Sequence, residues 1–234
     1  MLRRLIKASA IVIGVGLAVA GCAVTPLKMG AAAVAGSQRI SIATLGVDVA
    51  SLSQAVSQAT KQYPGALSLN ATQQTQATLS WLIRYQVNDE LARQQGITIS
   101  PGQAQMALNQ LYAAARSSAA QSGITNANDN LILAAYGIPP NTTNELGRWQ
   151  AIATEYMKIV NGGTTPTSSS AQTAASNKLN QAECLAAKAL NIQVNPQFGQ
   201  LDYSQYQVVT APSTVTRAQG PVKAASPVAT APAC

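Results

Sequence analysis

Between residues 44 and 190 the sequence repeats one pattern, in which apolar residues recur at helical spacing between a start signal and a stop signal. The clearest run covers about Thr72 to Gln95 and is followed by Gly96, a residue type that commonly closes helices. This spacing matches the 3.6-residue period of a helix and not the two-residue period of a strand. It therefore predicts a mainly α fold of about six helices. The apolar residues of this run are Leu79, Leu82, Ile83, Val87 and Leu91.

Capping signals place the other helices. Thr44 is the expected N-cap of the first helix. Capping boxes are expected at residues 100–103 (Ser-Pro-Gly-Gln), before the third helix, and at residues 142–145 (Thr-Thr-Asn-Glu), before the fifth. The fourth and sixth helices are expected over about 128–136 and 171–190.

The same spacing predicts which residues of these helices face the core. On the first helix they are Val47, Val49, Leu52, Val56 and Ala59. On the fifth they are Leu146, Trp149, Ala153, Tyr156, Met157 and Val160. On the sixth they are Leu179, Ala182, Leu185, Ala189 and Leu190.

Two short stretches outside the helical region have strand character. Residues 34–42 read as two strands joined by a Gly36-Ser37 turn. Near the other end, Ile192 and Val194 alternate with polar residues, and Pro196 places this strand at a sheet edge or strand end.

The N-terminal segment has the composition of an export signal. Three basic residues precede an apolar stretch from Ala8 to Ala20, which is short for a membrane span. The tetrad Val19-Ala20-Gly21-Cys22 resembles a bacterial lipobox, in which the signal is cut before a cysteine whose thiol carries the lipid. We therefore expect residues 1–21 to be a lipoprotein signal peptide, Cys22 the lipidation site and the cell membrane's outer face the location. The alternatives are a plain secretory signal and a membrane anchor with an incidental cysteine.

The charge balance gives little indication of a partner. The formal charge is +7, but the expected cleavage removes three basic residues and lowers it to +4. No run of five basic residues occurs, so we expect no nucleic-acid partner. The sequence has no histidine, which excludes histidine-based acid–base catalysis and most zinc sites. We expect no cofactor and no metal.

Two cysteines remain after Cys22, at positions 184 and 234. Outside the cell membrane Cys184 and Cys234 can form a disulfide. The alternatives are that both thiols are unpaired, or that Cys234 forms a disulfide with another molecule.

Composition divides the rest of the chain. Residues 22–33 are expected to tether a domain of residues 34–209 to the lipid. The Gly, Thr, Ser and Pro of residues 162–170 predict a flexible linker inside that domain. Residues 210–234 are rich in Ala and Pro and are expected to be a disordered tail.

Four segments, 34–45, 80–86, 96–101 and 195–199, together resemble the SurA/PrsA-type extracytoplasmic chaperones, in particular lipoproteins of high-GC Gram-positive bacteria with a SurA N-terminal domain. The resemblance covers roughly residues 34–209, and Gln197 stands where that family commonly has a basic residue. It implies that the strands at both ends of the domain meet in one small sheet, with Ile40 and Ile42 near Ile192 and Val194.

The chain departs from that family in one respect. Full-length members often insert a parvulin-type prolyl isomerase module where this chain has the linker 162–170, and the parvulin site uses histidines that this chain lacks. The resemblance therefore implies a chaperone-like module without isomerase activity, and we expect no enzyme and no catalytic residues.

Such a module would bind unfolded or exported polypeptide through apolar side chains in a groove. Aromatic residues and methionines suit varied partners, although at helical spacing they are more often core residues. Two other functions stay open: an interaction lipoprotein that binds one specific envelope partner, and an enzyme that uses Ser, Asp or Lys. The candidate polypeptide-binding residues are Trp81, Tyr85, Met106, Tyr112, Trp149 and Met157.

Overall fold

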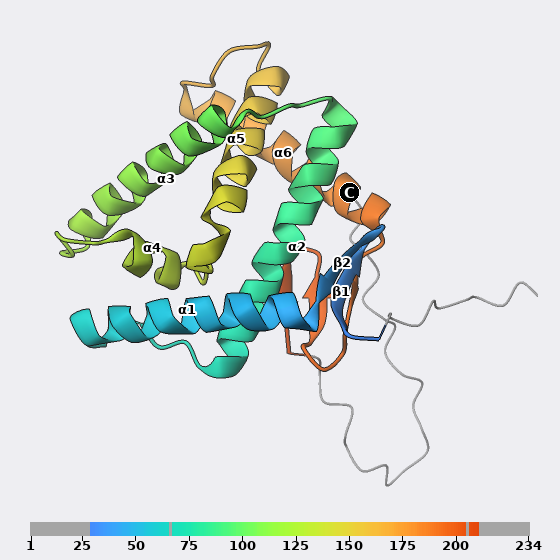
Figure 1. Cartoon of the computed structure of the whole chain (residues 1–234). Helices are drawn as coiled ribbons and strands as arrows, with labels where there is room; N and C mark the ends of the chain where they lie inside the picture. The colour runs from blue at the N-terminus through green and yellow to red at the C-terminus, as the bar shows by residue number, and fades with distance from the viewer. Residues whose placement is uncertain (1–28, 66, 205, 211–234) are drawn as a thin grey trace, which may run out of the picture.

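The computed structural model describes residues 29–65, 67–204 and 206–210 (Figure 1). Most of these described residues lie in six α-helices, which confirms the expected mainly α fold. The helices are α1 (Ile42–Gln62), α2 (Ala71–Gln95), α3 (Pro101–Gln121), α4 (Asp129–Ala135), α5 (Thr143–Val160) and α6 (Ser169–Leu190). A short 3-10 turn, η1 (Pro140–Thr142), precedes α5.

A small antiparallel sheet joins the two ends of the described region, as expected. Its order is β2 (Gln38–Ser41), β1 (Ala31–Ala35), β3 (Gln193–Val194), so β1 is the central strand. Ala33 pairs with Val194, and the Asn195 side chain donates a hydrogen bond to the Ala31 carbonyl at 3.1 Å. Because β1 lies between β2 and β3, Ile40 does not pair with the closing strand but meets Ile192 only in the core. The expectation for Ile42 is wrong, since it begins α1 and is exposed.

The central strand starts three residues earlier than the sequence indicated. Ala31, Ala32 and Ala33 fall in the expected tether but are buried in the sheet. Adjacent strand residues point to opposite faces, so β1 is covered on both sides. Small alanines allow α2, which contacts β1, to approach closely.

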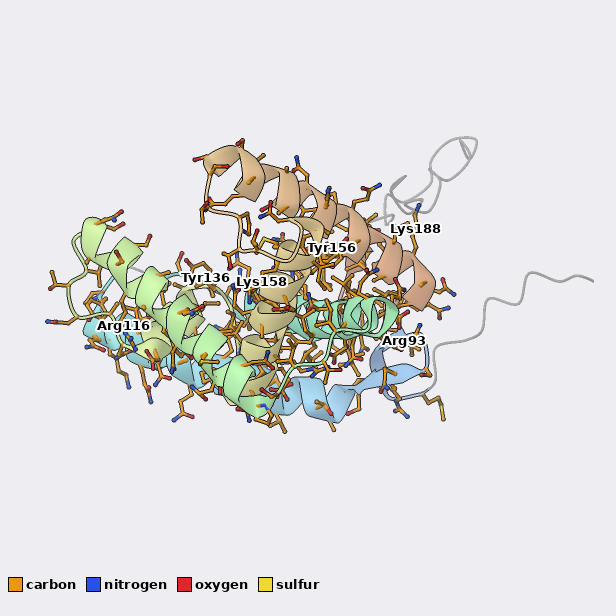
Figure 2. All side chains as sticks on the ribbon, turned by 90° about the horizontal axis from the view of Figure 1, so that it is seen from above. Arg93, Arg116, Tyr136, Tyr156, Lys158 and Lys188 are labelled. Carbon is orange, nitrogen blue, oxygen red and sulfur yellow. The ribbon has the colours of Figure 1, made fainter. Side chains whose placement is uncertain are left out.

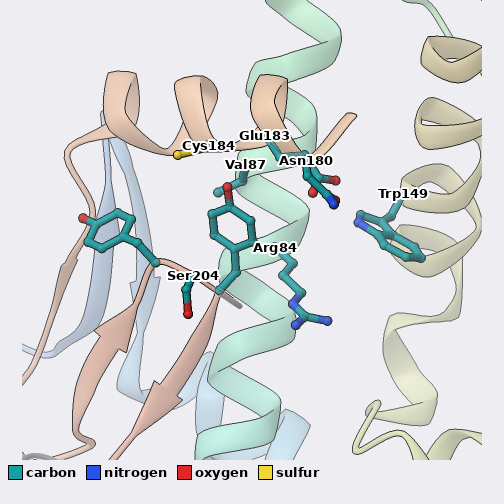
Figure 3. Close-up of a pocket in the computed structure, with 9 residues that line it drawn as sticks. Arg84, Val87, Trp149, Asn180, Glu183, Cys184 and Ser204 are labelled. Carbon is teal, nitrogen blue, oxygen red and sulfur yellow. The ribbon is translucent and has the colours of Figure 1, made fainter. Parts of the chain in front are cut away.

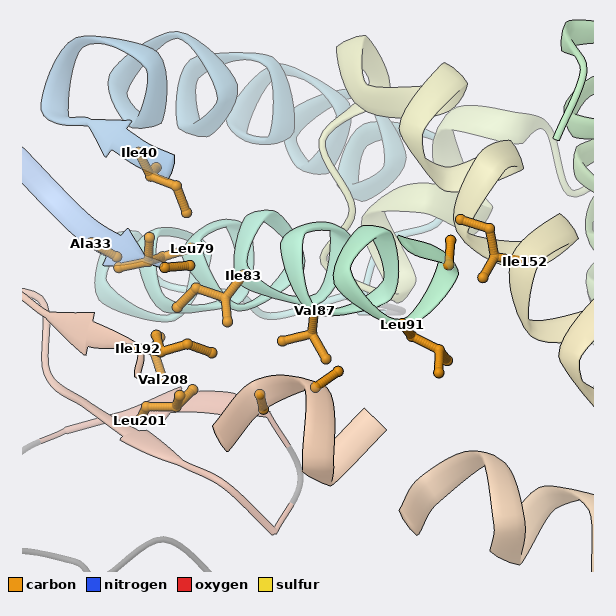
Figure 4. Close-up of a cluster of buried hydrophobic side chains, with 14 of the residues drawn as sticks. Ala33, Ile40, Leu79, Ile83, Val87, Leu91, Ile152, Ile192, Leu201 and Val208 are labelled. Carbon is orange, nitrogen blue, oxygen red and sulfur yellow. The ribbon is translucent and has the colours of Figure 1, made fainter. Parts of the chain in front are cut away.

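Helix α2 lies between the sheet and α6 on one side and α1, α3 and α4 on the other, and it contributes to two hydrophobic clusters (Figures 1 and 4). Leu79, Ile83, Val87 and Leu91 pack toward the sheet and α6. Trp81 and Tyr85 pack on the other side, in the cluster formed with α1, α3 and α4. Contacts on several sides give this helix its large number of buried residues.

Two of the four capping signals are confirmed and two are wrong. Ser100 and Gln103 form the expected capping box, and Gly96 closes α2 in the left-handed conformation. The N-cap of α1 is Ser41, whose hydroxyl accepts from the Thr44 N–H at 2.9 Å, so Thr44 lies inside the helix. Thr142 makes no capping hydrogen bond and instead donates to the Pro139 carbonyl at 2.9 Å within η1.

Three expected core residues, Val47, Leu185 and Ala189, lie at the surface. Val47 is 64% exposed and Leu185 is 50% exposed. Asp48, the residue after Val47, is buried instead and accepts from the Asn141 amide at 2.6 Å. The rest of both faces is placed correctly, since Leu52, Val56 and Ala182 are buried, so the error is confined to positions at the edge of each face.

The segment before α6 is shorter than the expected linker. Helix α6 begins at Ser169 after an N-cap at Ser168, so two residues of the expected linker are helical. Pro166 within the segment is buried.

A second hairpin was not expected from the sequence. It pairs β4 (Gln200–Asp202) with β5 (Gln207–Val209) beside α2, where the Val208 N–H donates to the Ser80 hydroxyl at 2.8 Å. Gly199 precedes it with a φ of 125°, and a Cβ at this position would lie 2.2 Å from the Val209 carbonyl oxygen. Only glycine fits this approach without a shift.

Basic side chains are spread over several helices (Figure 2). Arg93 pairs with Glu90 at 2.6 Å, Lys158 pairs with Glu155 at 3.1 Å, and Arg116 pairs with Asp129. Each of these pairs is at least partly exposed to solvent, so it contributes little to stability.

Candidate functional site

Three cavities adjoin one another and share lining residues, and together we call them the trough. The aromatic groove, of about 620 Å³, lies between α3, α5 and the turn after α4. The central cavity, of about 630 Å³, lies between α2 and β5. The polar pocket, of about 420 Å³, lies between α2, α5, α6 and the turn of the β4–β5 hairpin. Trp81 and Tyr136 are shared by the first two, Arg84 by the last two, and Trp149 by the groove and the pocket.

The aromatic groove is lined mostly by apolar side chains. Leu111 and Ala115 come from α3, Ile138 from the turn after α4, and Trp149 from α5. These elements are held together by the close packing of α3 against α5. The groove therefore presents apolar surface to solvent between helices that pack firmly on each other.

Trp81 is held in a fixed position at the centre of the trough. Its indole N–H donates to the Tyr136 carbonyl at 3.0 Å. The Trp149 ring meets it edge to face, with ring centroids 5.4 Å apart, and the Arg84 guanidinium lies 5.0 Å from its ring centroid. Edge-to-face rings and a cation over a ring are both favourable geometries, so this cluster is preorganised.

Tyr136 reaches the trough because of the glycine that follows it. Gly137 has a φ of 65°, and a Cβ there would lie 2.8 Å from the Cβ of Ala77 on α2. This close approach brings the turn after α4 against α2. The Tyr136 side chain is 58% exposed and lines both the groove and the central cavity.

The structure separates the six candidate polypeptide-binding residues. Trp81 and Trp149 line the aromatic groove together. Tyr85 and Tyr112 are buried core residues, and Tyr85 exchanges a hydrogen bond with the Thr142 hydroxyl at 3.2 Å. Met106 is 59% exposed but does not line the trough, and Met157 is half-buried on α5 outside it. Tyr85 and Tyr112 are therefore core residues, and Trp81 is buried in the same core cluster although it also lines the groove.

Sequence reasoning missed Leu111, Tyr136 and Ile138. The sequence predicts Tyr136 at the end of the fourth helix, and its place directly before Gly137 is the one signal that indicates an exposed aromatic residue. Leu111 lies at ordinary helical spacing, which gives no indication that a groove opens beside it.

The polar pocket holds two opposite charges partly withdrawn from water (Figure 3). Arg84 extends from α2, and Glu183 lies on α6, where it accepts from the Asn88 amide at 3.2 Å. Burial raises the pKa of Glu183, while that hydrogen bond and Arg84 oppose the shift. Burial likewise lowers the pKa of Arg84, and Glu183 opposes this. Burial also raises the pKa of Tyr206 in the same pocket.

Several expected features lie outside the described residues. They are the signal peptide 1–21, the lipidation site Cys22, the tether up to residue 28, and Cys234 with the tail from residue 211. Within the described part, no helix has the length and hydropathy needed to span a membrane. The same residues contain no cluster of three or more acidic, cysteine or histidine side chains suited to a metal ion.

No protein-family model, curated protein or solved structure matches this chain. The function of the trough therefore has to be inferred from its own geometry and chemistry.

Proposed function

We propose that this chain is a lipid-anchored, extracytoplasmic, chaperone-like protein of the SurA/PrsA type. It holds segments of unfolded or exported polypeptide in the trough and performs no catalysis on them. Attachment to the outer face of the membrane is proposed from the lipobox that ends at Cys22.

The observation that carries this proposal is the aromatic groove. The sequence has two tryptophans, and both line the groove beside the exposed ring of Tyr136. Unfolded polypeptide exposes aliphatic and aromatic side chains, which lose contact with water when they enter such a groove. A volume of about 620 Å³ accommodates a few side chains at a time. This favours weak, repeated contacts along a chain and not tight capture of one folded surface.

Two further features support the same assignment. The strands from both ends of the described region meet in one sheet, an arrangement that the family resemblance implies. The short segment between α5 and α6 lies where, by the resemblance, full-length SurA/PrsA-type proteins often carry an isomerase module. The absence of histidine argues against the parvulin mechanism.

An aggregation assay tests the proposal. The full chain is mixed at near-stoichiometric ratio with heat-unfolded citrate synthase and, separately, with rhodanese diluted from urea. We expect protection of both clients, because the groove binds apolar side chains without sequence specificity. Trp149→Ala, which removes one wall of the groove, should weaken the protection of both.

Met106→Ala is the matched control. Met106 lies on α3, the helix that also carries Leu111, but it does not line the groove. Truncating this exposed side chain should leave protection unchanged. Protection that is absent, or equally affected by both variants, contradicts the proposal. Binding of a single envelope protein without protection of either client would favour the dedicated interaction lipoprotein instead.

A further inference from the structure

The trough changes its chemical character from one cavity to the next. Among the described residues, the lining of the aromatic groove contains no charged side chain. The described lining of the central cavity contains one, Arg84, among uncharged polar and apolar neighbours. Glu183 lines the polar pocket and not the central cavity. An apolar site is therefore followed directly by a site with a single positive charge.

Arg84 is held where the groove and the central cavity meet. Its guanidinium carbon lies 5.0 Å from the centroid of the Trp81 ring, and Trp81 lines both cavities. Figure 3 shows the Arg84 side chain extending away from Glu183, which lies on α6. A guanidinium that lies over an aromatic ring still has its planar fork of N–H groups to donate to a carboxylate. The position of this cation is thus set before a ligand arrives.

The charge of Arg84 is partly withdrawn from water. The residue is half-buried, and burial lowers its pKa, while the carboxylate of Glu183 opposes this shift. A partly desolvated cation gains more from a carboxylate than an exposed cation does, because water screens their attraction less. Gln73, Gln76 and Gln207 make up much of the other polar lining of the central cavity and carry no charge. A carboxylate that enters this cavity meets the cation without an acidic neighbour in the described lining.

We propose that the central cavity binds the side-chain carboxylate of an aspartate or glutamate that lies close to an aromatic residue in the bound polypeptide. This inference rests on the proposed function, because the aromatic residue is the one that enters the groove. Arg84 binds the carboxylate through charge-assisted hydrogen bonds. The trough therefore prefers segments that carry both groups over segments that are only apolar.

The geometry limits how far apart the two residues of the bound segment can be. The ring centroids of Trp149 and Trp81 are 5.4 Å apart, and the guanidinium carbon of Arg84 lies 5.0 Å from the Trp81 centroid. Arg84 is therefore no more than 10.4 Å from the Trp149 ring, the two distances taken together. An extended chain advances about 3.3 Å per residue. A carboxylate up to about three positions from the aromatic residue can thus reach Arg84.

The position of Arg84 favours a side-chain carboxylate over the C-terminal carboxylate of a polypeptide. Arg84 lines the polar pocket as well as the central cavity, so the trough continues beyond it. A bound chain can therefore pass Arg84 and does not have to end there. Internal segments of an unfolded polypeptide also outnumber its single C-terminus.

Peptide titration followed by tryptophan fluorescence tests the proposal. Both tryptophans of the chain line the groove, so binding of a peptide without tryptophan can be followed through the protein's own emission. The full chain is titrated with acetyl-Ser-Phe-Ala-Glu-Ser-amide, with the same peptide containing Gln in place of Glu, and with acetyl-Ser-Phe-Ala-Gln that has a free C-terminal carboxylate. The Glu peptide should bind about tenfold more tightly than the Gln peptide, the low end of what a hydrogen bond to a charged group contributes.

Arg84→Met tests the role of the cation. Methionine keeps an apolar side chain beside Trp81 but removes the charge, so the Gln peptide should still bind and the preference for Glu should disappear. Arg84→Lys keeps the charge and should retain part of the preference. Arg148→Met is the matched control, because Arg148 pairs with Asp89 at 2.8 Å and is absent from the described lining of the trough. The tenfold preference should persist in this control.

The outcomes separate this inference from the proposed function. Equal binding of the Glu and Gln peptides, or a preference that survives in Arg84→Met, overturns the carboxylate site and leaves the polypeptide-binding groove in place. Tighter binding of the peptide with the free C-terminal carboxylate than of the Glu peptide also overturns the side-chain assignment. Binding of none of the three peptides overturns the proposed function together with this inference.

Discussion

At the scale of single residues, Gly147 sets how closely α5 approaches α3. A Cβ at this position would lie 2.6 Å from the Ala104 carbonyl oxygen and 3.2 Å from the Leu108 Cβ. Both neighbours belong to α3, so the two helices would have to move apart to admit a methyl group. The groove between these helices depends on their present spacing.

We predict that Gly147→Ala lowers the free energy of unfolding by about 1–3 kcal/mol, the usual cost of overpacking a tight interior contact. Gly46→Ala on α1 is the control, because nothing lies within 4 Å of its added Cβ. That change should instead stabilise the helix by up to about 1 kcal/mol. Urea unfolding measures the free energy of unfolding of both variants. A Gly147→Ala chain as stable as the unmodified one would show that α3 shifts to admit the methyl group at no cost.

Glu183 predicts a pH dependence of stability. Its pKa in the folded chain is raised by burial above the ordinary value of 4.5, so the folded state holds this proton more tightly than the unfolded state does. The contribution of Glu183 to stability is therefore fully present below pH 4.5 and is lost as the pH rises through the folded pKa. The stability of Glu183→Gln relative to the unmodified chain should accordingly increase from acidic to neutral pH.

Urea unfolding at a series of pH values from 4 to 8 measures this relative stability. Asp89→Asn is a suitable control, since Asp89 is exposed and pairs with Arg148 at the surface. Parallel stability curves for Glu183→Gln and the unmodified chain would mean that Glu183 is as well solvated in the folded state as in the unfolded one.

The residue scale also shows where sequence reasoning stops. Aromatic residues suit a binding groove, and on that ground Trp81, Tyr85, Tyr112 and Trp149 could all be selected from the sequence, but only Trp149 among them is not buried. Whether an aromatic side chain lines a groove or fills a core depends on which helix packs over it. That information lies in tertiary contacts and not in the spacing along one helix.

At the scale of elements, local capping chemistry made the helices predictable. Ser100 with Gln103 and the left-handed Gly96 act within one turn of their helix, so they can be read directly from the sequence. The β4–β5 hairpin could not be predicted in this way, because strands of three residues are too short to show an alternation. Its position depends on contacts with α2, such as the bond between Val208 and Ser80.

The C-terminal strands are expected to be necessary for a stable fold. Ile192, Leu201 and Val208 are buried against Leu79 and Ile83 of α2 (Figure 4). A chain that ends at Leu190 would expose this part of the core and leave β1 without its β3 partner. We predict that it loses cooperative thermal unfolding.

Circular dichroism during heating tests this prediction. The control is a chain that ends at Thr210, which keeps β3, β4 and β5 and should still unfold cooperatively. If the chain that ends at Leu190 unfolds as cooperatively as this control, the helices alone form the stable unit.

At the scale of the whole molecule, the trough is formed by elements that are far apart in the sequence. Arg84 from α2 and Trp149 from α5 connect its cavities, and Tyr206 and Thr210 from the C-terminal hairpin line its other side. The mainly α fold and the small sheet could be predicted from periodicity and resemblance. The trough could not, because it exists only where α2, α3, α5 and the missed hairpin come together.

The central claim is that unfolded polypeptide enters the aromatic groove, and site-specific photo-crosslinking tests it most directly. The full chain carries p-benzoylphenylalanine in place of Leu111, which lines the groove, or in place of Met106, on the same helix but outside the trough. Each chain is irradiated with urea-diluted rhodanese. The account predicts a crosslinked product from position 111 and little or none from position 106. Equal crosslinking from both positions, or none from position 111, would contradict it.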